Sequence, residues 1–418
     1  MIWRLAILLL PWQTRWFSDA SLAGWPWEQG RLAFYLSWIP MLVLIIRAFC
    51  HPRLRRNDNK WIYFSIGTLV AISAVSILRD HAAFRPILQW WVQVSVLALF
   101  VVALWRAKIS SRSVATWVVI SMIPHALIGV WQFASQQVIG NKWLGMASQL
   151  PQTLGVSVIA HDGLRILRAY GGFPHPNIFG GWLAVGSLLA IWLAATSHER
   201  RAQWIWTLIA SLFASVLVLT FSRAAWLGAA AGFVTSFVGA TLAVARAGTR
   251  PAPTRMHVLI FLFPILVLSF VIFSQRQHIF ARFDLSQRLE QKSVDQRVGS
   301  LRTGLDLFLK HPLIGSGPNA ELLIAPSNEK ARAPLEPPHH AYLLALDDVG
   351  IVGFVTIVFL IWMLLLNGER KARPYSLSSI VYCLSVLALF DHYLWSTWSG
   401  QVLVAIAILL VVEPKTDP

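Results

Sequence analysis

The chain has 418 residues, of which 56% are hydrophobic and 13% are charged, and its formal net charge is +16. So large an apolar fraction excludes an ordinary soluble globular protein. Apolar runs of about 17–25 residues, the length that crosses a hydrocarbon core of about 30 Å, recur along the chain and are continuous rather than alternating. The composition therefore predicts an all-α fold, a polytopic membrane helical bundle.

We predict about twelve transmembrane helices within a single integral membrane domain that covers residues 1–418. The expected spans are residues 2–17, 30–48, 61–79, 87–105, 114–134, 176–196, 204–221, 224–245, 257–274, 341–366, 375–391 and 397–412. Short basic loops at 53–56, 106–112, 199–201, 246–255 and 369–373 indicate the cytoplasmic side. Both long loops, 135–175 and 275–340, then fall on the outer side. This loop pattern explains the positive charge without a nucleic-acid partner.

The first long loop, 135–175, ends in the segment from Arg168 to Asn177, which contains His175-Pro176. Pro176 suits the first turn of the next helix, where its missing N–H needs no partner. The N-terminal amides of that helix would then face outward, where they stabilise anions. Arg168, His175 and Asn177 are therefore candidate substrate-binding residues.

The second long loop, 275–340, is the one long polar stretch in the chain and should carry much of the chemistry. Its apolar residues at 294, 298, 301, 305 and 308 follow helical spacing. Ser293 and Gln296 fit a capping box, and Pro312 should follow the end of this helix. We expect the amphipathic helix, 293 to about 310, to lie on the outer membrane face with Arg297 and Arg302 on its polar side.

Arg223 lies between two apolar runs that leave no room for a loop. A charge at such depth costs several kcal/mol unless it is paired or hydrated, which makes Arg223 a functional candidate. Snorkelling to the interface is the alternative.

Several His and Asp residues lie at the outer ends of spans. His339 follows two prolines and could act as a base near neutral pH, whereas its neighbour His340 would shape the site. Asp347 and Asp348 lie inside the next span and suit either a polar cavity or a buried structural role. The pair Asp391–His392 fits a structural hydrogen bond better than chemistry. Nucleotide-binding, zinc-binding and GxSxG motifs are absent from the sequence, so we predict neither a cofactor nor a metal.

Four motifs together resemble the O-antigen ligase and O-antigen polymerase superfamily. They cover about residues 165–355 and are Gly171–Gly180, Thr220–Arg223, Arg297 with His311–Gly317, and His339–Gly353. In that family the last motif has His-Asn before the span, so His339 takes the position of the catalytic His and His340 replaces Asn. Asp348 stands where the family has Glu.

The resemblance implies an inverting, metal-independent glycosyltransferase in the bacterial inner membrane, with its active site facing the periplasm. The donor would be a glycan on a polyprenyl diphosphate, and the acceptor a hydroxyl of a glycolipid or glycan. Arginines such as Arg223, Arg297 and Arg168 would hold the anionic leaving group, since they stay charged at any working pH. His339 would deprotonate the acceptor.

Other functions remain open alongside the ligase. The same chemistry serves a polymerase that joins lipid-linked repeat units, or transfer to a protein. Twelve spans also suit a polysaccharide transporter or flippase, although transporters tend to place polar residues at the membrane midplane in broken helices. A non-catalytic glycan-binding protein is the remaining alternative.

Overall fold

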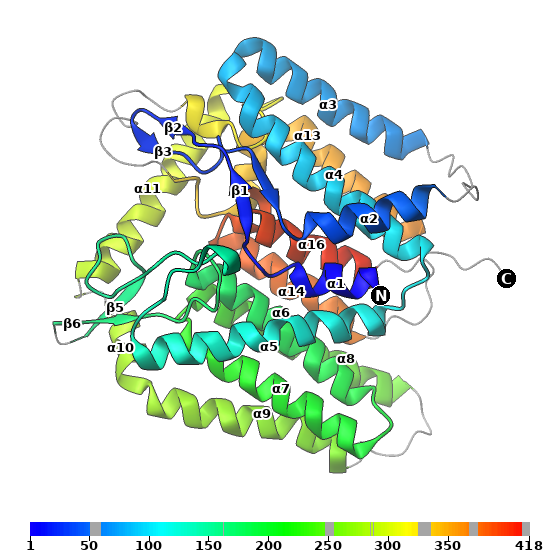
Figure 1. The fold of residues 1–418 in the computed structure, drawn as a ribbon, viewed down its shortest axis with the longest axis vertical. Helices are drawn as coiled ribbons and strands as arrows, with labels where there is room; N and C mark the ends of the chain where they lie inside the picture. The colour runs from blue at the N-terminus through cyan, green and yellow to red at the C-terminus, as the bar shows by residue number, and fades with distance from the viewer. Residues whose placement is uncertain are drawn as a thin grey trace.

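The computed structural model describes residues 1–50, 60–161, 163–246, 255–284, 286, 288–324, 336–367 and 375–411. Long helices lie side by side as one bundle, and the short strands gather with α10 and α11 at one end of it (Figure 1). The helices are α1 (Ile2–Leu9), α2 (Trp38–Phe49), α3 (Lys60–Arg79), α4 (Phe84–Arg106), α5 (Ser111–Ser135), α6 (Pro176–Ala195), α7 (Arg200–Leu219), α8 (Arg223–Arg246), α9 (Arg255–Ser274), α10 (Arg276–Phe283), α11 (Arg288–Lys310), α13 (Ala341–Asn367), α14 (Tyr375–Phe390), α15 (Tyr393–Ser396) and α16 (Trp398–Val411).

Three two-stranded antiparallel sheets complete the described structure. In the N-terminal segment, β1 (Arg15–Phe17) pairs with β4 (Ala33–Tyr35), and β2 (Ser21–Leu22) pairs with β3 (Trp25–Pro26). In the loop after α5, β5 (Val158–His161) pairs with β6 (Leu164–Leu167). Short 3-10 turns lie at His81–Ala83, Lys142–Leu144 and Glu321–Ile324.

The prediction of a helical membrane protein is confirmed, whereas the count of twelve spans is not. Within the described residues, five helices are long and apolar enough to cross a membrane, or six if the bent pair formed by α9 and α10 is one span. Shorter apolar helices coincide with further expected spans, at Trp38–Phe49, Phe64–Arg79, Ser378–Phe390 and Trp398–Val411. Of the basic loops, 53–56 and 369–373 lie outside the described residues, as do residues 247–254 of the loop 246–255.

The two expected spans at the N-terminus are shorter than predicted. Residues 2–17 do not form one helix, because α1 ends at Leu9 and β1 begins at Arg15. Pro11 has no backbone N–H with which to continue the helical ladder. In the expected span 30–48, the helix begins only at Trp38, since residues 33–35 form strand β4.

Helix α6 is the centre of the bundle. Within its apolar window, 94% of the residues are buried, and α5, α7, α8 and α14 pack around it. Its glycines permit close approach, since a Cβ at Gly180 would lie 2.9 Å from the Cβ of Ala225 in α8. This packing fixes the end of α6 that carries His175, Pro176 and Asn177.

Helix α13 is broken at Gly350, which has φ 64° and ψ −177°. The segment after α11 fills the break: Ser316 N–H and Gly317 N–H donate to the carbonyls of residues 347 and 348, each at 2.8 Å. In return, the N–H groups of residues 351 and 352 donate to the carbonyls of residues 312 and 313. Two motifs that are far apart in the sequence, His311–Gly317 and His339–Gly353, therefore form one backbone interlock.

The two long loops meet at one end of the bundle, as their predicted common side requires. Ile159 of β5, Phe221 and Ala281 of α10 form one buried cluster. The chain bends by 74° between α9 and α10 and then continues into α11. Helix α11 begins at Arg288 rather than at 293, so Ser293 lies inside it and the predicted capping box is wrong. It ends at Lys310, two residues before Pro312, as predicted.

Candidate active site

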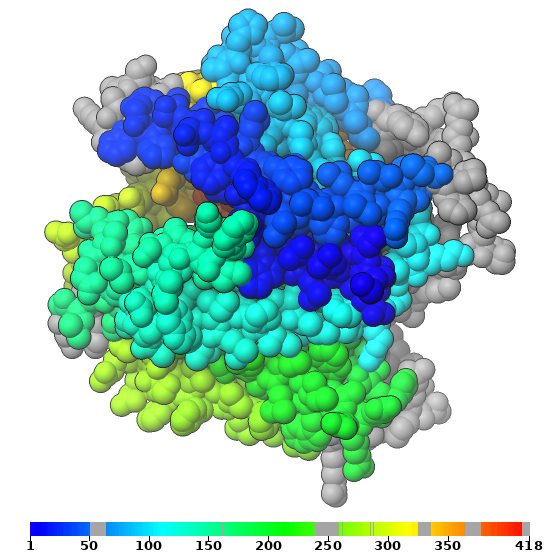
Figure 2. Space-filling model, in the orientation of Figure 1, coloured from blue at the N-terminus to red at the C-terminus, as the bar shows by residue number. Residues whose placement is uncertain are grey.

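A hollow opens at the end of the bundle where the loops meet. Figure 2 shows it between the N-terminal segment (blue) and the loop after α5 (cyan to green). The atoms at its floor have the yellow and orange of the region that holds α11 and α13. Polar residues come together at this end of the bundle from α6, α8, α10, α11, the segment before α13 and the turn after α14.

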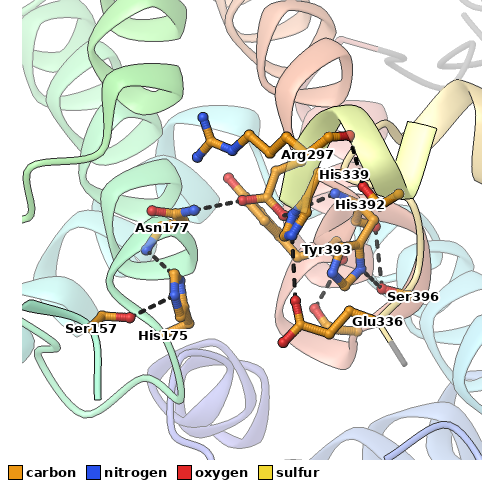
Figure 3. A network of polar contacts seen from close by, with 12 residues as sticks. Ser157, His175, Asn177, Arg297, Glu336, His339, His392, Tyr393 and Ser396 are labelled. Atoms are coloured by element: carbon orange, nitrogen blue, oxygen red, sulfur yellow. Dashed lines mark hydrogen bonds and ion pairs between the residues drawn. The ribbon is translucent and has the colours of Figure 1, made fainter. Parts of the chain in front are cut away.

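His339 lies between two carboxylates, and Figure 3 shows it beside Glu336. Its Nε2 atom is 3.4 Å from Glu336 Oε2, and its Nδ1 atom is 3.8 Å from Asp391 Oδ1. Burial alone lowers the pKa of His339, but the two carboxylates outweigh burial and raise the pKa to about 9. In the resting site, the ring is therefore mainly an imidazolium at neutral pH.

Asp391 connects His339 to the N-terminus of α6. Asn177 donates from Nδ2 to Asp391 Oδ2 at 2.8 Å and accepts at Oδ1 from Arg168 Nη2 at 2.7 Å. Burial opposes ionisation of Asp391, but His339 and His392 hold the pKa of this carboxyl well below its usual range. A continuous polar chain thus runs from Arg168 through Asn177 and Asp391 to His339.

His175 and His340 are both helix caps. His175 Nδ1 accepts from Asn177 N–H at 3.1 Å, so the neutral ring donates from Nε2 to Ser157 Oγ at 2.8 Å. Burial and Arg168 lower the pKa of His175 to about 3, which is consistent with this neutral form. His340 Nδ1 accepts from Leu343 N–H at 3.1 Å and caps α13. The His175 ring thus positions the start of α6, which carries Asn177, and the His340 ring positions the start of α13, which follows His339.

Arg223 starts α8 and lies beside Arg282 of α10. It donates from Nη1 to the Arg282 carbonyl at 3.0 Å, and its Nη2 is 3.4 Å from Glu290 Oε2. Arg282 itself forms an ion pair with Glu290 Oε1. The side chain of Arg282 also donates to the carbonyl of Phe221, and that of Arg168 donates to the carbonyl of Thr220. Both carbonyls lie at the C-terminal end of α7, where the helix dipole favours cations.

Arg297 of α11 completes a cluster of four arginines with Arg168, Arg223 and Arg282. It interacts electrostatically with Arg282, Glu290 and Asp391, and Figure 3 shows its guanidinium extended on the side of Asn177. Burial lowers the pKa of Arg168, and the neighbouring arginines lower it further, because like charges disfavour one another. A site with this excess of positive charge favours an anionic ligand.

An apolar cavity of about 470 Å³ adjoins the arginine cluster. It lies among α6, α7, α8, α9 and α10, and apart from Ser187 its lining residues are all apolar. Trp226 and Phe283 line its wall, and the ring of Phe283 lies 5.9 Å from the Arg223 guanidinium carbon. A charged head at the arginines and a hydrocarbon chain in the cavity would therefore be adjacent.

The other candidate residues have different surroundings. Arg302 is exposed on α11. Asp347 and Asp348 are buried at the break in α13, where Asp348 Oδ2 accepts from Trp395 Nε1 at 2.6 Å and from Asn319 N–H at 2.9 Å. This favours the structural role for Asp348. His339, Asp391 and His392 each place a ligand atom within 4.8 Å of the others, a set whose chemistry also suits a transition metal.

Sequence reasoning missed Glu336, Arg282 and Glu290, and it gave Asp391 only a structural role. Asp391 follows a span directly and precedes a His, which was the available signal. Arg282 and Glu290 are ordinary charges in a polar loop, and only the bend between α9 and α10 brings them to Arg223.

Comparison with known proteins finds one family for the middle of the chain. Residues 207–358 match the family model described as O-antigen ligase. This segment contains Arg223, Arg282, Arg297 and His339, whereas Arg168, His175 and Asp391 lie outside it. A search of curated proteins finds no match.

Proposed function

The chain belongs to the O-antigen ligase superfamily, and from this we propose that it transfers a glycan from a polyprenyl-diphosphate carrier to an acceptor hydroxyl. We further propose that it does so at the outer face of the bacterial inner membrane. The observation that carries this proposal is that an apolar cavity adjoins a cluster of four arginines, which a polar chain through Asn177 and Asp391 connects to His339. These features match the three parts of the reaction, which are an anionic leaving group, a lipid chain and a hydroxyl nucleophile.

The donor would bind across the arginine cluster and the cavity. Its isoprenoid chain would occupy the space lined by Trp226 and Phe283. Its diphosphate would lie against Arg223 and Arg297, because guanidinium groups bind phosphate through paired donors and remain charged. Arg168 donates to a backbone carbonyl and to Asn177, so it would position Asn177 and add to the positive field.

The reaction would invert the anomeric centre. The acceptor oxygen attacks the anomeric carbon from the face opposite the diphosphate, and the bond between that carbon and the phosphate oxygen breaks. The acceptor proton passes to neutral His339, and the arginines stabilise the negative charge that develops on the leaving diphosphate. Asp391 orients the imidazole and stabilises its charged form after proton transfer.

A reconstitution assay tests this proposal against the transporter alternative. The purified chain is placed in vesicles with a lipid-linked glycan donor and a glycolipid acceptor, and the products are resolved by mass. We expect covalent transfer of the glycan and release of polyprenyl diphosphate. Movement of the intact donor across the bilayer without a new glycosidic bond would instead favour a flippase.

A further inference from the structure

Glu290 holds the two arginines at the mouth of the apolar cavity together. This carboxylate lies near the start of α11, and its side chain is only 3% exposed. One oxygen pairs with Arg282 Nη1, and the other lies 3.4 Å from Arg223 Nη2. Arg223 in turn donates to the Arg282 carbonyl, so the three residues form a closed unit.

The contact with Arg223 is the weaker half of this unit. At 3.4 Å it is longer than a well-formed charge-assisted hydrogen bond, and Glu290 Oε2 is buried without a hydrogen-bond partner. A buried oxygen with unmet acceptor capacity carries a desolvation cost. A ligand with more oxygens and more charge could satisfy both guanidiniums better than this carboxylate does.

The local charge balance favours such a ligand. Glu290 interacts electrostatically with Arg168, Arg223 and Arg297, and Asp391 interacts with Arg297. Asp391 accepts from Asn177 and pairs with His339, whereas Glu290 contacts both Arg223 and Arg282. A diphosphate brings at least two negative charges, whereas Glu290 brings one.

We infer that Arg223 and Arg282 form the clamp for the donor diphosphate, and that Glu290 occupies this clamp until the donor displaces it. The inference rests on the proposed function and adds Arg282 as a donor-binding residue and Glu290 as an internal competitor. Because Glu290 and Arg297 belong to the same helix, its displacement also couples donor binding to the placement of α11.

Replacing Glu290 by Gln tests the competition directly, because Gln keeps the shape and removes the charge. The binding of undecaprenyl diphosphate to the full-length protein in nanodiscs is measured, with undecaprenol as the uncharged control. We expect Glu290→Gln to bind the diphosphate on the order of tenfold more tightly, a common size for coupling between two ligands. Arg282→Gln should weaken the same binding.

Asp295→Asn is the matched control, since Asp295 is an exposed carboxylate on the same helix. Equal tightening by Asp295→Asn would reveal a general charge effect and overturn the inference. Unchanged or weaker binding by Glu290→Gln would also overturn it, because Glu290 would then be an anchor and not a competitor. Failure of the unaltered protein to bind undecaprenyl diphosphate would overturn the proposed function as well.

Hydrogen exchange of the unaltered protein provides a test that does not depend on the folding of a variant. Displacement of Glu290 should free the start of α11, so adding undecaprenyl diphosphate should increase amide exchange over residues 288–292. Protection of these amides, or no change in their exchange, would contradict displacement.

Discussion

At the scale of single residues, His339 and its two carboxylates determine how the reaction should depend on pH. A base must be neutral, but Asp391 and Glu336 raise the pKa of His339 to about 9. We therefore expect kcat/KM for transfer to rise from neutral pH and to level off above about pH 9. Asp391→Asn removes one carboxylate, so the inflection should move to lower pH. A rate that falls as the pH rises toward 9 would show that the protonated ring is the active form.

Asn177 offers a second test at this scale, because it bonds both Arg168 and Asp391. Asn177→Ala removes two hydrogen bonds to charged groups, each worth about 1.5–3 kcal/mol when buried. We expect a lower melting temperature and a lower kcat, since Asp391 would no longer hold the imidazole in place. Thermal unfolding and steady-state kinetics measure the two effects. Normal stability together with normal kcat would contradict a positioning role.

At the scale of elements, the interlock between α13 and the segment after α11 depends on Gly350. A Cβ at Gly350 would collide with the backbone of Leu313, and its φ of 64° strains any other residue. Gly350→Ala should lower the free energy of unfolding by about 1–3 kcal/mol or more, since such backbone strain usually costs that much. The matched control is Gly67→Ala in α3, where a Cβ meets nothing within 4 Å.

Thermal unfolding of both glycine variants in the same detergent provides the comparison. We expect a clearly lower melting temperature for Gly350→Ala and little change in the melting temperature for Gly67→Ala. Equal melting temperatures for the two variants would show that the break tolerates a side chain.

Long apolar runs made most helices predictable, because a span needs only length and hydrophobicity. The predicted bounds of the two N-terminal spans were wrong because short strands interrupt the apolar residues there. Strand β4 is itself apolar, so its composition does not distinguish it from a helix. The predicted start of α11 was also wrong. The Ser293–Gln296 pattern fits a capping box, but the packed turn that carries Glu290 extends the helix to Arg288.

At the scale of the whole molecule, the site is assembled from segments that are distant in the sequence. The expected depth of Arg223 in the membrane made it a candidate, and the position of His339 before a span made it another, and both stay predictions. Asn177 and Asp391 are 214 residues apart, and Arg223 and Arg282 are 59 apart, so only the packing of α6 and the bend after α9 join them. Contacts of this kind have no local signature in a single sequence.

The charge of the arginine cluster predicts that transfer does not require a divalent cation. The purified protein should keep its activity in excess EDTA, because guanidiniums and not a metal would neutralise the diphosphate. Loss of transfer in EDTA with recovery on adding one ion would contradict this, and would point to the set formed by His339, Asp391 and His392.

The acceptor decides between ligase and polymerase. With a lipid A core acceptor and a polyprenyl-linked donor offered together, we expect the glycan on the core. A longer glycan on the polyprenyl carrier, with the core unmodified, would identify a polymerase.

The most direct test of the central claim is the rate of glycan transfer by His339→Ala in reconstituted vesicles. His81→Ala is the control, since His81 is an exposed His in the 3-10 turn before α4. We expect His339→Ala to lose roughly 10²- to 10⁴-fold in rate while remaining folded, as for the loss of a general base. Transfer by well-folded His339→Ala at the rate of the control would contradict the assignment of this hollow as the active site.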